Sequence, residues 1–99
     1  MNVVTMTGRL VKEVKTIAGE KGDGCVFTLA CQKDKEHADF FPCSAWGNTA
    51  TYLDSYTHKG DLLGIRGRLT MYKDKNDNMK IGVVVDSAEI LAYNKKEDK

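Results

Sequence analysis

Short stretches in which apolar side chains recur at every second position make up most of this chain. Such alternation is typical of β-strands, because successive side chains of a strand point to opposite faces. The stretch Cys25–Gln32 shows it well, with Phe27 and Leu29 on one face and Thr28 and Gln32 on the other. The pattern predicts a mainly β protein with one face of each strand buried.

Four further stretches are predicted to form strands, and turn-forming residues separate them. The predicted strands are Asn2–Ile17, Asp39–Trp46, Leu62–Lys73 and Met79–Tyr93. The connections are predicted at Glu20–Gly24, Lys33–His37 and Asp74–Asn78, which are rich in Gly, Asp, Asn and Lys. Gly8 lies inside the first stretch, where a glycine often marks the bend that a barrel needs.

One stretch has helical spacing instead. Thr49, Tyr52, Leu53 and Tyr56 share one face of a helix that begins with Asn48 as N-cap. We expect it to end near Lys59, with Gly60 in the left-handed conformation. Three strands, a helix and two strands follow the order of the OB-fold, a five-stranded Greek-key barrel. The order alone does not separate this fold from other small barrels.

Length and charge narrow the range of functions. The 99 residues make one domain, residues 1–93, followed by a charged tail, residues 94–99. The 15 Lys and Arg residues nearly balance the 14 Asp and Glu residues. A protein that holds duplex DNA through its phosphates is usually clearly basic, so this class is disfavoured. No secretion signal and no membrane-spanning run of ~18 apolar residues are present, and we expect a cytoplasmic protein.

The cysteines and histidines give little support to catalysis or metal binding. Cys25, Cys31 and Cys43 are odd in number and form no Cys-x-x-Cys motif, which argues against a disulfide framework and a zinc site. We expect three apolar, reduced cysteines and no cofactor. Cys43 and His58 have the chemistry of a nucleophile and a base, but no third orienting group accompanies them. We therefore expect a protein that is not an enzyme.

Strand parity indicates a binding face. The third predicted strand places Phe40, Pro42, Ser44 and Trp46 on one face and Phe41, Cys43 and Ala45 on the other. The fourth places Leu63, Ile65, Leu69 and Met71 on an apolar face, opposite Arg66, Arg68, Thr70 and Tyr72. Exposed aromatic rings beside basic residues suit unpaired nucleic-acid bases, which stack on them. Parity also allows the opposite interpretation, in which Phe40 and Trp46 belong to the core.

Five segments, spread over nearly the whole chain, resemble segments of one known protein family and follow one another in the same order as in that family. They are Val3–Leu10, Phe27–Ala30, Ala38–Gly47, Tyr56–Leu62 and Ile65–Leu69. This series resembles the single-stranded DNA-binding protein family of bacteria and phages. The resemblance implies an OB-fold that binds single-stranded DNA without sequence preference, in replication, recombination or repair. It also implies a homotetramer or a homodimer, with Phe41 at a subunit contact.

The resemblance assigns the candidate binding residues. It implies base stacking on Phe40, Trp46 and Tyr72. The residues expected to contact phosphates are Arg9, Lys33, Lys35, Lys59, Arg66, Arg68 and Lys73. The loop Lys33–His37 lacks the extra stacking aromatic of some members, so charge replaces stacking there.

The chain also departs from longer members of the family. Those members end in an acidic tip that recruits replication and repair enzymes, whereas this sequence ends in Asn94–Lys99. We therefore expect no recruitment through such a tip. Two alternatives stay open: a primosome-assembly adapter resembling PriB, and an RNA-binding OB domain of the cold-shock type.

Overall fold

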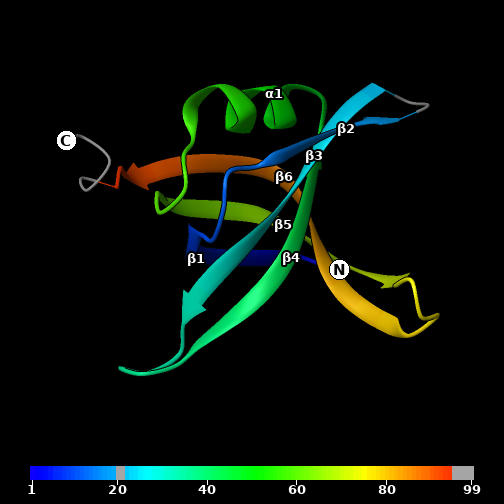
Figure 1. The fold of residues 1–99 in the computed structure, drawn as a ribbon, viewed down its shortest axis with the longest axis horizontal. Coiled ribbons are helices and arrows are strands. Elements are labelled where there is room, and N and C mark those ends of the chain that lie inside the picture. Colours follow the sequence, from blue (N-terminus) through cyan, green and yellow to red (C-terminus); the bar gives the residue numbers. More distant parts are fainter. Residues whose placement is uncertain (20–21, 95–99) are drawn as a thin grey trace.

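The computed structural model describes residues 1–19 and 22–94, which form six strands and one helix (Figure 1). The elements are β1 (Val4–Leu10), β2 (Lys15–Gly19), β3 (Gly22–Gln32), β4 (Ala38–Trp46), α1 (Gly47–Tyr56), β5 (Leu62–Lys73) and β6 (Met79–Ala92). Residues 20–21 of the predicted turn and residues 95–99 of the predicted tail lie outside the described residues.

The strands curl into a closed barrel, which confirms the predicted OB-fold class. The ring runs β1-β5-β6-β4-β3 and closes where Arg9 and Leu10 of β1 pair with β3. Its pairs are antiparallel except for β4 and β6, which run parallel with Cys43 opposite Val83. β2 lies outside the ring, and in the part of the chain that the structure describes it pairs with β3 alone. Among the described residues, no helix is long and apolar enough to cross a membrane.

The predicted first strand is wrong as a single element, because it divides into β1 and β2. Leu10 and Val11 leave the β-ladder with β5: their amides donate to the carbonyls of Asp61 at 3.0 Å and Thr28 at 3.1 Å. These long-range bonds turn the chain over the end of the barrel. β2 can then form a hairpin with β3, in which Lys15 lies opposite Val26.

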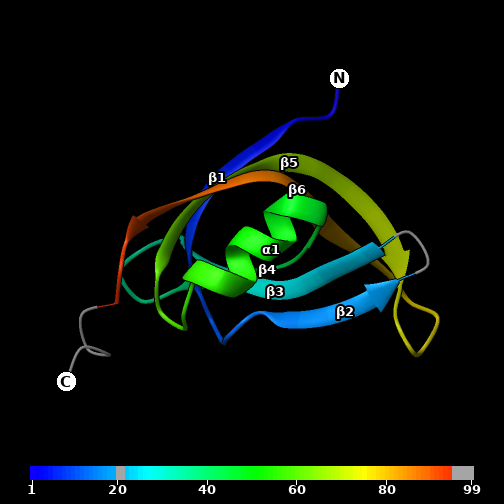
Figure 2. The same cartoon turned by 90° about the horizontal axis from the view of Figure 1, so that it is seen from above.

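The core resolves the parity of β4. Cys43 and Ala45 are buried inside the barrel with side chains from β3, β5 and β6, and Phe41 packs against this cluster. α1 closes one end of the barrel (Figure 2), where Ala50 and Leu53 enter the core. Leu53 is fully buried, so replacing it with alanine would cost about 2–5 kcal/mol. Phe40 and Trp46 consequently lie on the outer face.

Both predicted ends of the helix need correction. Trp46 is the N-cap residue and provides no side-chain hydrogen bond, whereas Asn48 lies within the helix. The helix ends at Tyr56, and the Thr57 amide caps it by donating to the Leu53 carbonyl at 3.1 Å. Gly60 adopts the expected left-handed conformation, with φ of 91°, but in the turn beyond the helix. There its amide donates to the Leu10 carbonyl, which ties the turn to β1.

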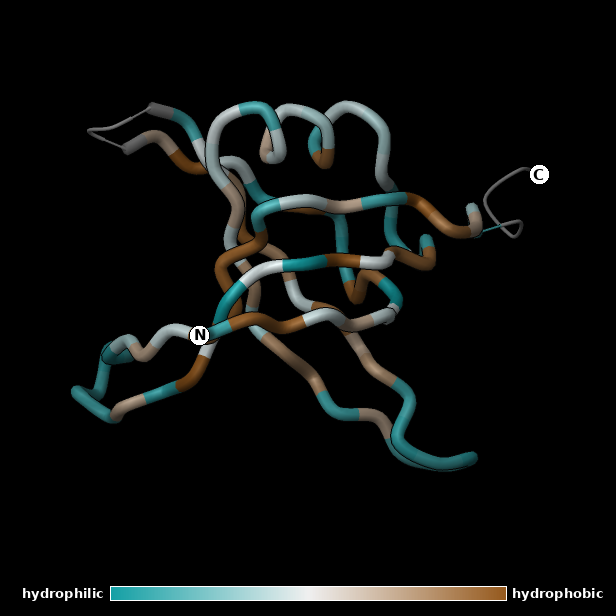
Figure 3. Tube along the Cα trace, turned by 180° about the vertical axis from the view of Figure 1, so that it is seen from behind, coloured by the Kyte–Doolittle hydropathy of each residue, from teal (hydrophilic) through white to brown (hydrophobic). Residues whose placement is uncertain are grey.

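The apolar face predicted for β5 is only partly buried. Leu63 and Ile65 are in the core, but Leu69 and Met71 are exposed. The β3–β4 and β5–β6 hairpins project away from α1 and diverge (Figure 1), so the outer half of β5 has no second layer over it. Figure 3 shows hydrophobic segments on the β5–β6 hairpin close to the barrel and a hydrophilic tip.

Candidate nucleic-acid interface

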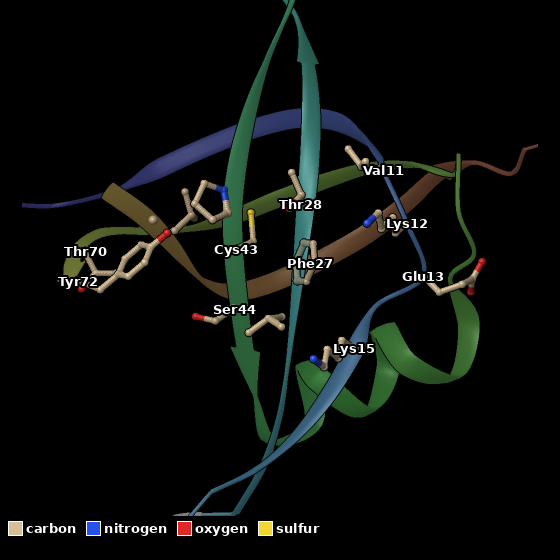
Figure 4. A pocket seen from close by; sticks show the side chains of 14 residues that line it. Val11, Lys12, Glu13, Lys15, Phe27, Thr28, Cys43, Ser44, Thr70 and Tyr72 are labelled. Atoms are coloured by element: carbon tan, nitrogen blue, oxygen red, sulfur yellow. The ribbon is translucent and has the colours of Figure 1, made fainter. Parts of the chain in front are cut away.

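A groove of about 590 Å³ crosses the outer face of β3 and β4 (Figure 4). The β5–β6 hairpin borders one end with Thr70 and Tyr72, and the segment between β1 and β2 borders the other with Lys12 and Glu13. The remaining lining residues are Val11, Lys15, Val26, Phe27, Thr28, Pro42, Cys43, Ser44, Gly82 and Val83. The groove is therefore a mainly apolar floor with polar and cationic borders.

The border of the groove at Lys12 carries a net positive charge, because two lysines and one glutamate line it. Lys12 and Lys15 are both exposed, and the side chain of Lys15 extends from β2 at the groove (Figure 4). The Glu13 carboxylate is engaged elsewhere: it accepts a hydrogen bond from the Lys59 amide at 2.6 Å and lies 3.3 Å from His58 Nδ1. A phosphate entering this border meets two ammonium groups that form no ion pair within residues 1–19 and 22–94, and a carboxylate that the turn after α1 holds.

The three predicted stacking residues are exposed. The exposed fractions are 62% for Phe40, 44% for Trp46 and 41% for Tyr72. Phe40 and Trp46 occupy opposite ends of β4, about 20 Å apart at the rise of an extended strand. Pro42 and Ser44 lie between them on the same outer face, at the floor of the groove that Tyr72 borders. The aromatic residues thus mark a path along β4 and across to β5.

The predicted basic residues are distributed around this path and do not line the groove. Lys33 and Lys35 lie in the loop before β4, close in sequence to Phe40, and the Lys33 ammonium is 3.7 Å from Asp39. Arg68 precedes Thr70 and Tyr72 on the same face of β5. These three cations can reach a strand that leaves the groove at either end.

The other four lie elsewhere on the barrel. Arg9 and Lys59 meet near the turn after α1, where Arg9 Nη1 donates to the Gly60 carbonyl at 2.9 Å. Lys73 lies on the side of β5 opposite to Tyr72, with its ammonium 3.5 Å from Asp77. Arg66 lines a second hollow, on the outer face of β1, β5 and β6, and is not beside the aromatic residues. The curl of the sheet separates Arg66 from the face that flat parity assigned to it.

Sequence reasoning missed Lys12 and Lys15 as candidate binding residues. It placed both inside one continuous strand, where alternation gave no reason to select them. The bend at Val11–Val14 between β1 and β2 brings them to the groove, and the local signal was the pair Lys12-Glu13 interrupting the apolar pattern.

The pair considered for catalysis has the wrong environment. Cys43 is buried, and desolvation, with a smaller contribution from Cys31, raises the pKa of its thiol to about 12. A thiol with this pKa is protonated at neutral pH and is a poor nucleophile. His58 is exposed and interacts with Glu13. Within residues 1–19 and 22–94, no group of three His, Cys, Asp or Glu side chains is placed to hold a metal ion.

The structure is a closed five-stranded barrel with a helix between β4 and β5 and with exposed aromatic residues along β4. These features define an OB-fold protein with a face of the type that binds nucleic acids. The profile described as "Single-strand binding protein family" matches residues 1–95. The chain therefore belongs to the single-strand binding protein family.

Curated relatives agree with this assignment. The chain is 32% identical to "Single-stranded DNA-binding protein 1" of Clostridium acetobutylicum, over 99% of this chain and 98% of that protein. It is 32% identical to a single-stranded DNA-binding protein of Malacoplasma penetrans, over 93% of this chain and 52% of that protein. A protein of the same name from Thermosynechococcus vestitus is 31% identical over 99% of this chain and 88% of its own length.

Proposed function

We propose that this protein binds single-stranded DNA without sequence preference, by stacking bases on Trp46, Phe40 and Tyr72. The observation that carries the proposal is the exposure of these three rings on one outer path beside a groove, when a small barrel would normally bury its large aromatic residues. Each stacked base contributes about 1–3 kcal/mol, and every base has a face to offer. Membership of the single-strand binding protein family supports the same function.

Phosphate contacts supply the second part of the affinity. Lys12 and Lys15 are the cations closest to the groove, and Lys33, Lys35 and Arg68 flank the aromatic path. Arg9, Lys59, Arg66 and Lys73 would contact a strand only if it continued around the barrel. A chain with a net charge of +1 suits this mechanism, since stacking reduces the number of ion pairs required.

The expected role follows from this binding mode. Duplex DNA hides the faces of its bases, so the protein selects exposed single strands and keeps them from pairing again. We infer a role without catalysis in protecting such strands during replication, recombination or repair. The free cysteines and the bacterial relatives support a place in the cytoplasm of a bacterial or phage-infected cell.

Fluorescence anisotropy with labelled oligonucleotides tests the proposal. Oligo-dT, a mixed-sequence strand, a matched RNA and a matched duplex are titrated at one salt concentration. We expect similar affinities for the two DNA strands and much weaker binding of the duplex. Tighter binding of RNA than of DNA would transfer the function to RNA, and equal binding of the duplex would refute the stacking mechanism.

We also propose that the protein forms a homodimer or homotetramer. Val4–Gly8 of β1 pair with β5 on one side, and among the described residues they have no strand on the other side. Such an edge favours pairing with a second chain. The β5–β6 hairpin adds an exposed apolar face, and Met71 and Ile81 lie opposite each other on it. Phe41, half-buried against the core, is the residue that the family resemblance places at a subunit contact.

Light scattering coupled to size exclusion tests the assembly. We expect a mass of twice or four times the 11.0 kDa of one chain, as for a homodimer or a homotetramer. Met71→Lys should lower it, whereas Asn76→Lys, which adds the same charge at the tip of the same hairpin, should not. A monomeric wild-type protein would refute the oligomer, and an unchanged mass for Met71→Lys would exclude the hairpin from the contact.

A further inference from the structure

Two outward-facing glycines are buried beneath the aromatic residues of the proposed binding face. Gly24 of β3 lies directly opposite Trp46 of β4 and is buried although it is not on the core side of the sheet. A Cβ atom at Gly24 would lie 2.4 Å from Trp46 Cε3 and 2.7 Å from Cζ3. The six-membered ring of Trp46 therefore occupies the space that any other residue would fill with its side chain.

Gly82 has the same relation to Tyr72. It lies on β6 opposite Thr70, two residues along from the pair Tyr72–Lys80 and on the same face, and it is buried. A Cβ atom at Gly82 would lie 3.1 Å from Tyr72 Cε1 and 3.5 Å from Cδ1. It would also lie 3.3 Å from the Pro42 carbonyl oxygen, so the Tyr72 ring edge and the backbone of β4 both border this position on β6. Gly82 itself lines the groove.

A ring that rests on a glycine has one side covered by backbone and the other side open. The exposed fractions of Trp46 and Tyr72, 44% and 41%, agree with rings covered on one side. Phe40 provides a comparison within the same face: its cross-strand partner is Ala30, which has a Cβ atom, and Phe40 is 62% exposed. The two rings that lie over glycines are therefore more covered by the barrel than Phe40 is.

We propose that Gly24 and Gly82 are positioning residues that hold Trp46 and Tyr72 flat on the barrel with one face ready for a base. The inference rests on the proposed function. A ring fixed before binding loses little conformational freedom when a base stacks on it, so its orientation contributes directly to affinity. An alanine at either position would tilt the ring away from the sheet while leaving the aromatic residue in place.

Gly82→Ala is the main test, because the atom nearest to its Cβ would be Tyr72 Cε1 at 3.1 Å, and the nearest backbone atom, the Pro42 carbonyl oxygen, would be 3.3 Å away. Gly24→Ala is harsher, since its Cβ atom would also lie 2.8 Å from the Ala45 carbonyl oxygen. Gly64→Ala is the matched control: it lies on a neighbouring part of the sheet, and the three atoms nearest to its Cβ would all belong to the flexible side chain of Leu91, the first at 3.3 Å. All three variants are compared with wild type by thermal unfolding and oligo-dT titration.

We expect Gly82→Ala to weaken oligo-dT binding about 3- to 10-fold, a part of the contribution of one stacked base. Gly64→Ala should bind like wild type. In a Tyr72→Ala background, Gly82→Ala should have no further effect on binding, because no ring remains to be displaced. Gly24→Ala should shift the emission of Trp46 to longer wavelength without DNA, as the ring loses its backbone support.

Two results would overturn the inference. One is wild-type binding and wild-type emission in both glycine variants. The other is a binding loss from Gly82→Ala that persists in the Tyr72→Ala background, which would show that the glycine acts through the sheet. Failure of the wild-type protein to bind oligo-dT would instead refute the proposed function, and the emission of Trp46 in the absence of DNA would still decide whether Gly24 supports the ring.

Discussion

Replacing Trp46 with alanine separates its role in binding from its role in folding. The side chain is 44% exposed and covers Gly24, so about half of it is available to a base and half packs on the barrel. Loss of the stacked base should weaken oligo-dT binding by about 1–3 kcal/mol, which is about 5- to 150-fold in Kd.

The folding cost follows from the covered half. A fully buried aromatic residue costs about 3–5 kcal/mol when truncated to alanine, so Trp46→Ala should cost about 1.5–2.5 kcal/mol. In a domain of this size, 1 kcal/mol corresponds to a shift in Tm of about 4–8 °C, and the variant should remain folded at 25 °C. Trp46→Phe should recover part of both effects, since it restores a ring over Gly24.

Anisotropy titrations at 25 °C and thermal unfolding of the same samples provide the measurement. Tyr93→Ala is the control, because Tyr93 is also an exposed aromatic residue, at 61%, but follows β6 at its C-terminal end. If Trp46→Ala unfolds the protein, the ring belongs to the core and the assigned face is wrong. If it binds oligo-dT with wild-type affinity, base stacking on Trp46 is refuted.

Three further predictions concern charge, thiol chemistry and the turn after α1. The logarithm of the affinity for oligo-dT should fall linearly with the logarithm of the salt concentration. The double variant Lys12→Gln/Lys15→Gln should reduce the magnitude of this slope by about 1.4, or about 0.7 for each lost phosphate contact. An unchanged slope would show that these two lysines do not contact the phosphates. Cys31 is partly buried and should react with a thiol reagent at pH 8 before Cys43 does. The Cys43 thiol stays protonated until the pH approaches its pKa of about 12, so it should react only when the protein unfolds. Equal reaction rates of the two thiols would contradict the burial of Cys43. The buried Asp61 carboxylate accepts hydrogen bonds from the backbone amides of His58 at 2.9 Å and Asn94 at 2.7 Å. Asp61→Ala should therefore lower the free energy of unfolding, measured by chemical denaturation, by about 2–4 kcal/mol. A loss below about 0.5 kcal/mol would show that water replaces the carboxylate.

Local pattern was sufficient to predict most strands but not how the barrel closes. The alternation in Cys25–Gln32 survives because one face of β3 packs on the core throughout. The division of the first strand depends on bonds from Leu10 and Val11 to Asp61 and Thr28, which are distant in sequence. Residue type at positions 11–14 does not encode those partners, so the break could not be placed from the sequence.

The exposure of the three aromatic rings agrees with the face that was expected for them, whereas none of the predicted basic residues lines the groove beside these rings. Strand parity placed Phe40 and Trp46 on one face of β4 but left open which face is buried, and the family resemblance assigned these rings and Tyr72 to base stacking. Parity assumes a flat sheet, however, and the curl of the barrel moves Arg66 to another surface while the turn after β1 brings Lys12 to the groove. Parity also assigned Met71 to the apolar face of β5, but Met71 is exposed because the hairpin extends beyond the core.

The emission of Trp46 tests the central claim most directly, since it is the only tryptophan in the chain. Wild-type protein is titrated with oligo-dT and, separately, with a matched duplex. Stacking on an exposed ring predicts strong, saturable quenching by oligo-dT and little change with the duplex. Oligo-dT that binds by anisotropy but leaves the emission of Trp46 unchanged would contradict the account, because the base-stacking face would then lie elsewhere on the barrel.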